Sequence, residues 1–177
     1  MSMQGEEFTE AELLALELEK RNSERAGENS PEPDVTLLTF YLGDEWFGIL
    51  LEQIKVVARM LEVTQVPGAS NYILGVVNYR SAIYPLIDLH KMFELIPSLP
   101  TRASRIVIIN HEHHPFGILV DSTTEVKHVR QSELNKQVDS SSGISNYINA
   151  EISLDSKMLG VLNIEAILRM IAGADQS

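Results

Sequence analysis

The fold of this chain is decided by residues 72–89, which read Tyr72-Ile-Leu-Gly75-Val-Val-Asn78-Tyr-Arg80-Ser81-Ala82-Ile-Tyr-Pro85-Leu-Ile-Asp88-Leu89. Two apolar runs flank one polar Asn-x-Arg corner, a pattern typical of two short strands joined by a turn. No nucleophile motif, phosphate loop or metal-ligand cluster accompanies them. We therefore expect a shaped surface with a single placed cation, which indicates binding rather than catalysis.

Alternating apolar and polar residues continue on both sides of this stretch. Residues 36–42 alternate, and Gly43-Asp44-Glu45 forms a turn before residues 46–49, which predicts a hairpin. A second hairpin is predicted from residues 105–109 and 116–120, across the polar turn 111–115. Further short strands are predicted at residues 54–58, 63–66, 73–79, 82–87, 125–129, 148–154 and 158–162.

Many short strands and few helices indicate an all-β barrel or sandwich. The two hairpins also share a plan, because both contain a Phe-Gly-Ile segment, at residues 47–49 and 116–118. We therefore expect two related small barrels that join near residues 95–104, a segment bracketed by prolines. Asp88 is expected to cap a short helix, and a terminal helix is expected from residue 163 or 164 through 171, with Gly173 beyond its end.

Residues 1–34 form an acidic extension, with ten Asp or Glu against three Lys or Arg, a net charge of −7. Thr9 and Glu12 have capping-box spacing, which predicts a helix over about residues 10–24. Its leucines crowd one side and would allow docking on the domain or on a partner. The simpler expectation is a solvated, partly frayed arm, because isolated helices of about 12 to 15 residues are marginal in water. Residues 27–34 are predicted to be a linker to the domain at 35–171.

Composition excludes several classes of partner. The formal charge of −11 argues against binding to a nucleic-acid backbone. The chain has no cysteine, so disulfides and thiolate metal sites are excluded. No apolar run reaches the roughly 18 residues of a membrane helix, and the N-terminus lacks the features of a signal peptide. We expect a cytoplasmic protein that does not insert into a membrane.

The histidines invite a metal hypothesis that their spacing does not support. His111-Glu112-His113-His114 lacks the spacing that would place two imidazoles on one helical face, and it falls on a predicted turn. His90 and His128 are isolated along the chain. Asp88 and Asp121 are explained by helix capping and by a turn. We therefore predict no metal, no cofactor and no enzymatic activity.

Several blocks, in order across residues 36–171, together resemble the CheW family, the adaptors of bacterial chemosensory arrays. Each block alone is weak, but their order and spacing across nearly the whole domain are specific. The matching blocks are residues 40–49, Gln53 to Val57, Val66-Pro67, Gly75 to Leu89, Arg105 to Ile109, Gly117 to Asp121, Glu125-Val126 and Leu162 to Leu168.

The resemblance implies a fold of two small five-stranded antiparallel β-barrels around a shared hydrophobic core. It also implies a non-enzymatic adaptor that couples the cytoplasmic tip of a chemoreceptor to the regulatory domain of a CheA-type histidine kinase. The alternative is a diverged CheW-like regulatory or competitor module that has lost one partner, with the acidic helix masking or replacing a binding surface. A pilus-motility or other chemosensory system is as compatible with the sequence as flagellar taxis.

The resemblance also implies a partner-binding site. Arg80 matches an arginine expected near the receptor-binding region, in a block that includes Gly75, Asn78 and Tyr79. A structural arginine that pins the corner to Asn78 or to a carboxylate is the alternative. Ile54 and Val56 fall on a strand that the family uses at partner surfaces, and alternation places both on one face. The alternative for Ile54 and Val56 is that both side chains pack in the hydrophobic core.

The sequence departs from the family pattern in three ways. Ser81 replaces the usual glycine after the arginine, Val56-Val57 replaces the usual Glu-Ile pair, and Tyr79 replaces the usual leucine. Loss of the carboxylate at Val56 removes a potential salt bridge to a partner. Tyr79 adds an amphipathic ring. These changes are expected to alter the choice of partner.

Overall fold

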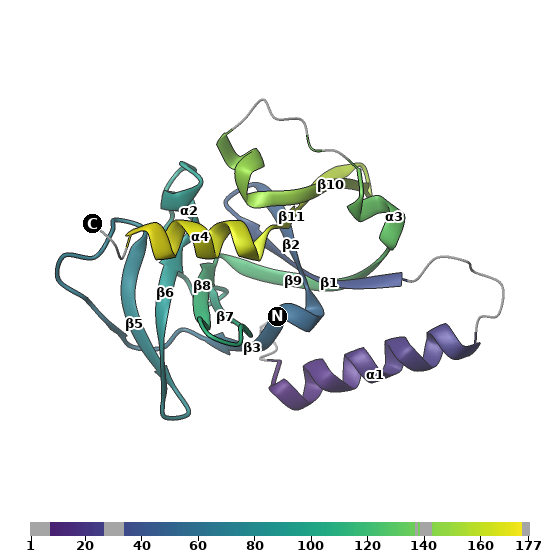
Figure 1. Cartoon of the computed structure of the whole chain (residues 1–177), viewed down its shortest axis with the longest axis horizontal. Coiled ribbons are helices and arrows are strands. Elements are labelled where there is room, and N and C mark those ends of the chain that lie inside the picture. The colour runs from purple at the N-terminus through teal and green to yellow at the C-terminus, as the bar shows by residue number, and fades with distance from the viewer. Residues whose placement is uncertain (1–7, 27–33, 137, 139–142, 175–177) are drawn as a thin grey trace.

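The computed structural model describes residues 8–26, 34–136, 138 and 143–174 (Figure 1). The linker predicted over residues 27–34 falls outside these residues except for Asp34, which begins the first strand. The strands are β1 (Asp34–Leu42), β2 (Glu45–Leu50), β3 (Ile54–Arg59), β4 (Val63–Thr64), β5 (Ile73–Tyr79), β6 (Ala82–Asp88), β7 (Arg105–Ile109), β8 (Phe116–Val120), β9 (Ser122–Arg130), β10 (Ile148–Leu154) and β11 (Lys157–Leu162). The helices are α1 (Glu10–Ala26), η1 (Leu51–Gln53), α2 (Leu89–Met92), α3 (Gln131–Leu134), η2 (Gly143–Tyr147) and α4 (Ile164–Ala174).

The strands form two sheets, which confirms the all-β prediction. The first has the order β10-β11-β2-β1-β9 and the second the order β3-β7-β8-β6-β5-β4. The expectation of purely antiparallel sheets of five strands is corrected in two respects. Each sheet holds one parallel pair, β11 with β2 and β6 with β8, and β4 adds a sixth strand to the second sheet. In the second sheet the edge strands β3 and β4 are consecutive in the chain, so this sheet curls toward closure.

The two sheets repeat one arrangement. The hairpin β1–β2 in the first sheet corresponds to the hairpin β7–β8 in the second. In both sheets the second strand of that hairpin lies parallel to a strand, β11 or β6, that leads into a helix, α4 or α2. The repeat predicted from the two Phe-Gly-Ile segments is therefore present in the strand order.

The chain crosses between the sheets at places other than residues 95–104. That segment links α2 to β7, and the strands on both sides of it, β6 and β7, belong to the second sheet. The chain enters the second sheet through η1, which follows β2, and returns to the first at Asp121, between β8 and β9. The second sheet thus forms from one continuous stretch inserted between two parts of the first.

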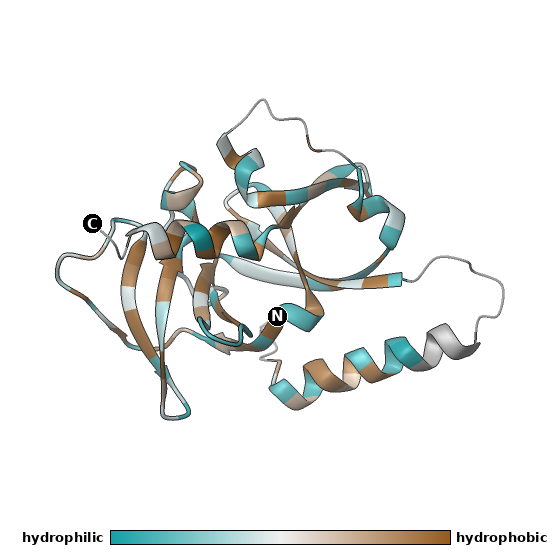
Figure 2. Ribbon diagram, viewed as in Figure 1, coloured by the Kyte–Doolittle hydropathy of each residue, from teal (hydrophilic) through white to brown (hydrophobic). Residues whose placement is uncertain are grey.

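One hydrophobic cluster joins the sheets. It contains Phe40 and Ile49 from the first sheet and Val107 and Ile118 from the second, all of them buried. Each sheet also has a smaller cluster on its other face, around Leu159 in the first and Tyr84 in the second. Figure 2 shows hydrophobic residues along the strands of both sheets. Burial of this apolar surface is the main stabilising contribution to the fold.

The helix α1 does not behave as a solvated arm. Its N-terminus has the predicted capping box, in which Glu12 Oε2 accepts from Thr9 N at 2.6 Å and Thr9 Oγ1 accepts from Glu12 N at 3.3 Å. Leu13 is 4% exposed and belongs to the cluster that joins the sheets. In Figure 1, α1 lies beside β1 and β3, with its N-terminal end toward the body of the domain.

The remaining helices differ from expectation in detail. Asp88 caps α2 as predicted, since its Oδ1 accepts from His90 N at 3.0 Å and from Lys91 N at 3.4 Å. The terminal helix α4 extends through Gly173 to Ala174 rather than ending before the glycine. The short helices α3 and η2 were not predicted, because four or five residues carry no readable helical period.

Candidate partner-binding surface

The hairpin β5–β6 presents the Asn-x-Arg corner at its tip. Tyr79 pairs with Ala82, so the turn contains only Arg80 and Ser81. Their φ angles are 48° and 67°, both in the left-handed region. A two-residue hairpin turn needs this backbone because its twist matches that of the strands. The β5–β6 hairpin extends away from the rest of the domain in Figure 1. Arg80 at its tip is exposed.

Local contacts order this tip. Asn78 Oδ1 accepts a hydrogen bond from Ser81 N at 3.1 Å. The Arg80 guanidinium carbon lies 5.4 Å from the centre of the Tyr79 ring, a cation–π contact. Within the described part of the chain Arg80 makes no ion pair, so the carboxylate partner considered for a purely structural arginine is absent there. The donors of Arg80 point to no internal acceptor among these residues.

Gly75 lies inside β5, within the strand predicted over residues 73–79. Its φ is 147°, and the register of β5 against β6 shifts between Ile73 and Gly75. A Cβ at this position would lie 2.2 Å from the carbonyl oxygen of Thr64. The absence of a side chain at Gly75 therefore allows the backbone of β4 to approach and pair with β5. Gly75 is buried and so supports the hairpin from within.

Ile54 and Val56 do not share a face. The register of β3 against β7 shifts between them, and this irregularity breaks the alternation. Ile54 packs in the cluster that joins the sheets, whereas Val56 packs in the cluster around Tyr84. Their side chains are 6% and 1% exposed. Both residues therefore pack in the hydrophobic core, which was the alternative to a partner-binding role. The structure thus groups Asn78, Tyr79 and Arg80 at one tip and separates Ile54 and Val56 from them.

Sequence reasoning missed one residue of the tip. Ile83 is 67% exposed, three residues after Arg80 and on the strand that leaves the turn. Its neighbours Tyr84 and Leu86 are buried, and strict alternation along β6 would have pointed Ile83 outward. Ile83 pairs with Asn78, so the hairpin that carries Arg80 also presents an exposed apolar side chain near its tip.

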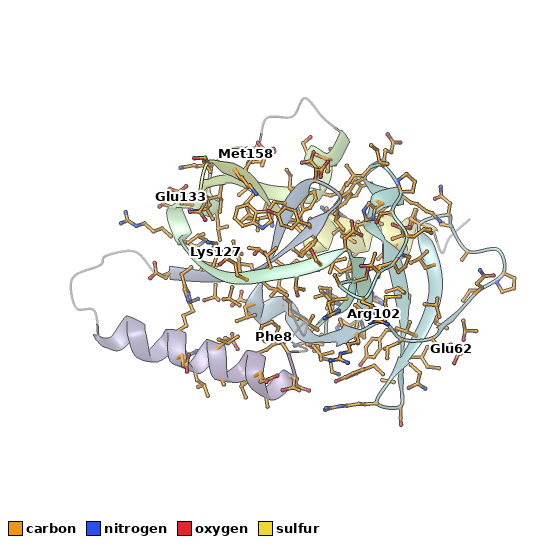
Figure 3. All side chains as sticks on the ribbon, turned by 180° about the vertical axis from the view of Figure 1, so that it is seen from behind. Phe8, Glu62, Arg102, Lys127, Glu133 and Met158 are labelled. Atoms are coloured by element: carbon orange, nitrogen blue, oxygen red, sulfur yellow. The ribbon has the colours of Figure 1, made fainter. Side chains whose placement is uncertain are left out.

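The hairpin β10–β11 is the counterpart of this hairpin in the first sheet. Its turn residues Asp155 and Ser156 also have positive φ, 50° and 63°, and Met158 is exposed beside them (Figure 3). The charge is opposite, because Asp155 stands where the other tip has Arg80. Lys127 Nζ binds Glu125 at 2.8 Å and Asp155 at 3.0 Å, and these hydrogen bonds raise the pKa of Lys127 above its usual 10.5.

A polar junction connects the two sheets. Asp121 accepts from Gly43 N at 2.6 Å and from Ser98 Oγ at 2.8 Å, and its Oδ2 lies 3.1 Å from Nε2 of His90. His90 is 3% exposed, and its Nδ1 lies 3.6 Å from Asp88 Oδ1. Gly43, His90 and Asp121 are far apart in the sequence. The fold brings them together where the tip of the first hairpin meets α2.

This junction contains Ser, His and Asp side chains, but their hydrogen bonds do not activate the serine. Ser98 Oγ lies 3.5 Å from His90 Nε2 and donates instead to Asp121. Nε2 of His90 is hydrogen-bonded to Asp121. This is the nitrogen that would have to accept the serine proton if His90 acted as a general base. At the predicted turn after β7, His114 N donates to His111 Nδ1 at 3.1 Å. Among the described residues, no three His, Cys, Asp or Glu side chains are placed so that they could hold a metal ion together.

The double sheet, the shared core and the exposed hairpin tip define a scaffold-type binding domain. A model of the CheW-like domain family matches residues 36–172. The chain belongs to this family and is a CheW-like chemotaxis adaptor. No helix in the described residues is long and apolar enough to cross a membrane.

Curated relatives agree with this assignment. The chain is 32% identical over 136 residues to the chemotaxis protein CheW of Treponema pallidum, covering 74% of this chain and 80% of the relative. It is 26% identical over 154 residues to CheW of Helicobacter pylori, covering 87% and 93%. The scaffolding protein TtCheW from Thermoanaerobacter tengcongensis has the same fold, with a TM-score of 0.66 and 24% identity over 73% of this chain and 88% of that one.

Proposed function

We propose that this chain is a cytoplasmic, non-enzymatic adaptor that couples chemoreceptors to a CheA-type histidine kinase. The observation that carries the proposal is the β5–β6 tip, which presents Arg80 without an internal ion pair among the described residues, on the same hairpin as exposed Ile83. A guanidinium fork suits a carboxylate or backbone carbonyls on a partner. Membership of the CheW-like family supports the class of partner.

Within this proposal the tip residues have different roles. Arg80 contacts the partner, Tyr79 holds the guanidinium by its ring, and Asn78 orders the turn. Ile54 and Val56 act from the core by shaping the sheet that carries the hairpin, and Gly75 allows the pairing of β4 with β5. We place the receptor at this tip, on the grounds of the family resemblance at Arg80, and the regulatory domain of the kinase on another surface.

The test is a binding titration with purified components. The chain is titrated separately with a soluble cytoplasmic fragment of a chemoreceptor and with the regulatory domain of a CheA-type kinase from the same cell. Arg80→Ala is expected to weaken receptor binding about tenfold, the effect of losing a contact of about 1.4 kcal/mol. Kinase binding is expected to stay unchanged.

Arg169→Ala is the matched control, since Arg169 is an exposed arginine on α4, away from the tip. This variant should bind both partners as the unmodified chain does. Binding to the kinase alone, with no receptor affinity in any variant, would favour the alternative of an adaptor that has lost one partner. Binding to neither partner would contradict the proposed function.

A further inference from the structure

A buried arginine lies at the start of β7. Arg105 is 4% exposed, and among the described residues no other lysine or arginine is buried. Its Nη1 donates to the carbonyl oxygens of Arg102 and Ser104, at 2.8 Å each. No carboxylate in the described part of the chain forms an ion pair with it. The positive charge is therefore removed from water without an opposite charge beside it, which is unfavourable.

The donors of this guanidinium that remain unused form one edge of it. Arg105 Nε is buried and has no hydrogen-bond partner among the described residues. The N–H of Nε and one N–H of Nη2 are parallel in an arginine, and this pair matches the two oxygens of one carboxylate. Buried donors without a partner are rare in folded proteins. The free edge of Arg105 therefore indicates that a ligand completes the site.

The turn before β7 fixes the position of Arg105. Thr101 N donates to Ser104 Oγ at 2.8 Å, and Ser104 N donates to Thr101 O at 3.1 Å. Ala103 N donates to Thr101 Oγ1 at 3.2 Å. The carbonyl groups of this ordered turn hold Nη1 in place. A guanidinium that is already held loses little conformational freedom when a ligand binds its other edge.

Arg59 provides a second positive charge at this place. It is the last residue of β3 and pairs with Arg105 in the register of β3 against β7. Residues directly opposite in an antiparallel pair extend their side chains from the same face. Arg59 is exposed and takes part in an interaction of its own, so Arg105 is the defining residue of the site. Arg102, in the turn, is also exposed (Figure 3), and in a chain with a formal charge of −11 these arginines make a local positive region.

We propose that Arg105 and Arg59 form a binding site for the carboxylate of an Asp or Glu side chain on a partner protein. The edge formed by Nε and Nη2 of Arg105 binds both carboxylate oxygens. The exposed side chain of Arg59 moves to admit the carboxylate and adds a second positive charge. The ligand thereby supplies the negative charge that the buried guanidinium lacks among the described residues.

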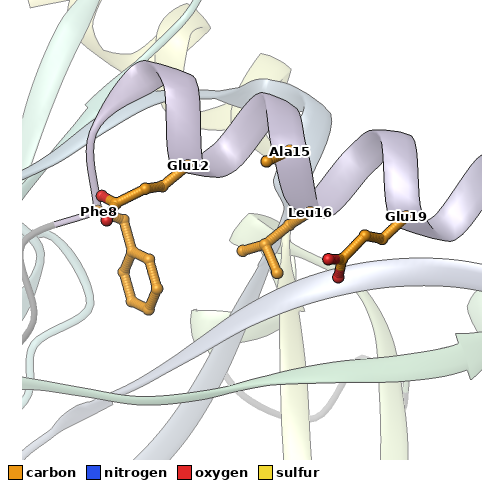
Figure 4. Close-up of a pocket in the computed structure, with 5 residues that line it drawn as sticks. All are labelled: Phe8, Glu12, Ala15, Leu16 and Glu19. Carbon is orange, nitrogen blue, oxygen red and sulfur yellow. The ribbon is translucent and has the colours of Figure 1, made fainter.

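The surroundings of the site favour a side chain of a protein over a small molecule. Small-molecule sites are usually cavities that enclose most of the ligand. A cavity of about 220 Å³ lies beside α1, but neither arginine lines it, and its two glutamates disfavour an anion. Its lining residues are Phe8, Glu12, Ala15, Leu16 and Glu19 (Figure 4). Arg59 and residues 101–103 of the turn lie instead on the exposed surface, where a second protein can reach them.

This site is separate from the tip at Arg80. Arg105 pairs with Val120 at the end of β8, and β8 lies parallel to β6. Arg80 lies in the turn before β6 begins. The site and the tip are therefore at opposite ends of these strands, so the inference goes beyond the proposed function.

The test is an NMR titration of the full isotope-labelled chain, in which the Nε–H signal of Arg105 is followed. Arg105→Lys identifies this signal by its disappearance. The probe is the peptide N-acetyl-Gly-Glu-Gly-amide, and its control has glutamine in place of the glutamate. The Arg105 signal is expected to shift until it saturates with the glutamate peptide and to stay in place with the glutamine peptide. The signal of Arg169, an exposed arginine on α4, should not move with either peptide.

Variants of the full chain measure the role of each arginine. Arg105→Lys keeps the positive charge but loses the planar pair of donors, so it is expected to weaken binding of the glutamate peptide at least about tenfold. Backbone amide signals of β7 report binding in this variant. Arg59→Gln should weaken binding by a smaller factor, and Arg169→Gln should leave it unchanged. If Arg105→Lys does not fold, the titration of the unmodified chain still decides.

Several results would contradict the proposal. If the Arg105 signal does not respond to the glutamate peptide, the guanidinium is a structural group only. An equal response to both peptides would exclude recognition of the carboxylate, and tighter binding of inorganic phosphate than of the glutamate peptide would indicate a phosphate site. If the peptide binds only after Glu6→Gln and Glu7→Gln are made together, the ligand is a carboxylate of the same chain rather than of a partner. Neither kinase nor receptor enters the assay, so its result is separate from that of the proposed function.

Discussion

At the scale of single residues, the turn at Arg80 and Ser81 is built on a strained backbone. Ser81 has a φ of 67°, where a residue with a side chain is disfavoured by about 1 kcal/mol relative to glycine. Ser81→Gly is therefore expected to raise the free energy of unfolding by about 0.5 to 1 kcal/mol, measured by urea denaturation. Asn78 Oδ1 accepts from the backbone of Ser81, so this hydrogen bond survives the substitution.

Ser156→Gly provides a parallel case, because Ser156 has a φ of 63° at the corresponding turn of the first sheet. Both variants should gain stability by similar amounts. A loss of stability in Ser81→Gly would show that its hydroxyl makes a stabilising interaction that outweighs the backbone strain. The departure from the family glycine at this position would then have a structural cause.

Gly75 presents the opposite case, in which a side chain cannot be accommodated. A Cβ would lie 2.2 Å from Thr64 O and 2.8 Å from Thr64 C, and φ is 147°. Gly75→Ala is expected to destabilise the fold by about 3 kcal/mol or more, since β4 must move away from β5. Gly68→Ala is the control, because its φ of 77° is also positive but a Cβ there would meet no described atom within 4 Å. Urea denaturation should show a loss of only about 1 kcal/mol for the control, and equal losses would contradict the steric argument.

At the scale of elements, the junction around Asp121 holds the first hairpin against α2. Removing the carboxylate leaves Gly43 N and the buried imidazole of His90 without their acceptor. Asp121→Ala is expected to lower the free energy of unfolding by about 2 to 4 kcal/mol. Thermal or urea denaturation measures this loss. Glu112→Ala, at a side chain that is 87% exposed, should change it by less than about 0.5 kcal/mol, and a similar small effect for Asp121→Ala would show that the junction is not stabilising.

Strands could be predicted from the sequence where the local pattern of apolar and turn residues alone determines them. Residues 105–109, 116–120 and 148–154 were predicted as strands with the bounds that β7, β8 and β10 have, because apolar runs ended by turn residues leave little choice. The shared face expected for Ile54 and Val56 was wrong because an irregular register cannot be read from one strand. The expectation of a solvated N-terminal arm was wrong, since the docking of α1 depends on a face assembled from β1, η1 and β3.

The tip of the candidate site was predictable for a similar reason. Asn78, Tyr79, Arg80 and Ser81 are contiguous, so any hairpin with this turn brings them together. The junction was not predictable, because His90 and Ser98 meet Asp121 only when β8 pairs with β6, and Gly43 joins them from the first sheet. The parallel pairs of β11 with β2 and β6 with β8 also depend on contacts between distant segments.

At the scale of the whole molecule, the shared core predicts how the protein unfolds. Phe40 from the first sheet and Ile118 from the second lie in the same buried cluster, and the chain crosses between the sheets twice. Neither sheet can lose its structure without exposing apolar surface of the other. We therefore expect one thermal transition, with a calorimetric enthalpy equal to the van't Hoff enthalpy.

Substitutions in the two sheets test this cooperativity. Phe40→Leu and Ile118→Val, one in each sheet, should both lower the temperature of the same single transition. The isoleucine change is expected to cost about 0.5 to 1.5 kcal/mol, and the phenylalanine change more, because it removes more buried volume. Differential scanning calorimetry would contradict the argument if either variant split the transition in two. Separate transitions would mean that the two sheets fold as independent units. The orientation of the Arg80 tip relative to the first sheet would then depend on the junction around Asp121 rather than on the shared core.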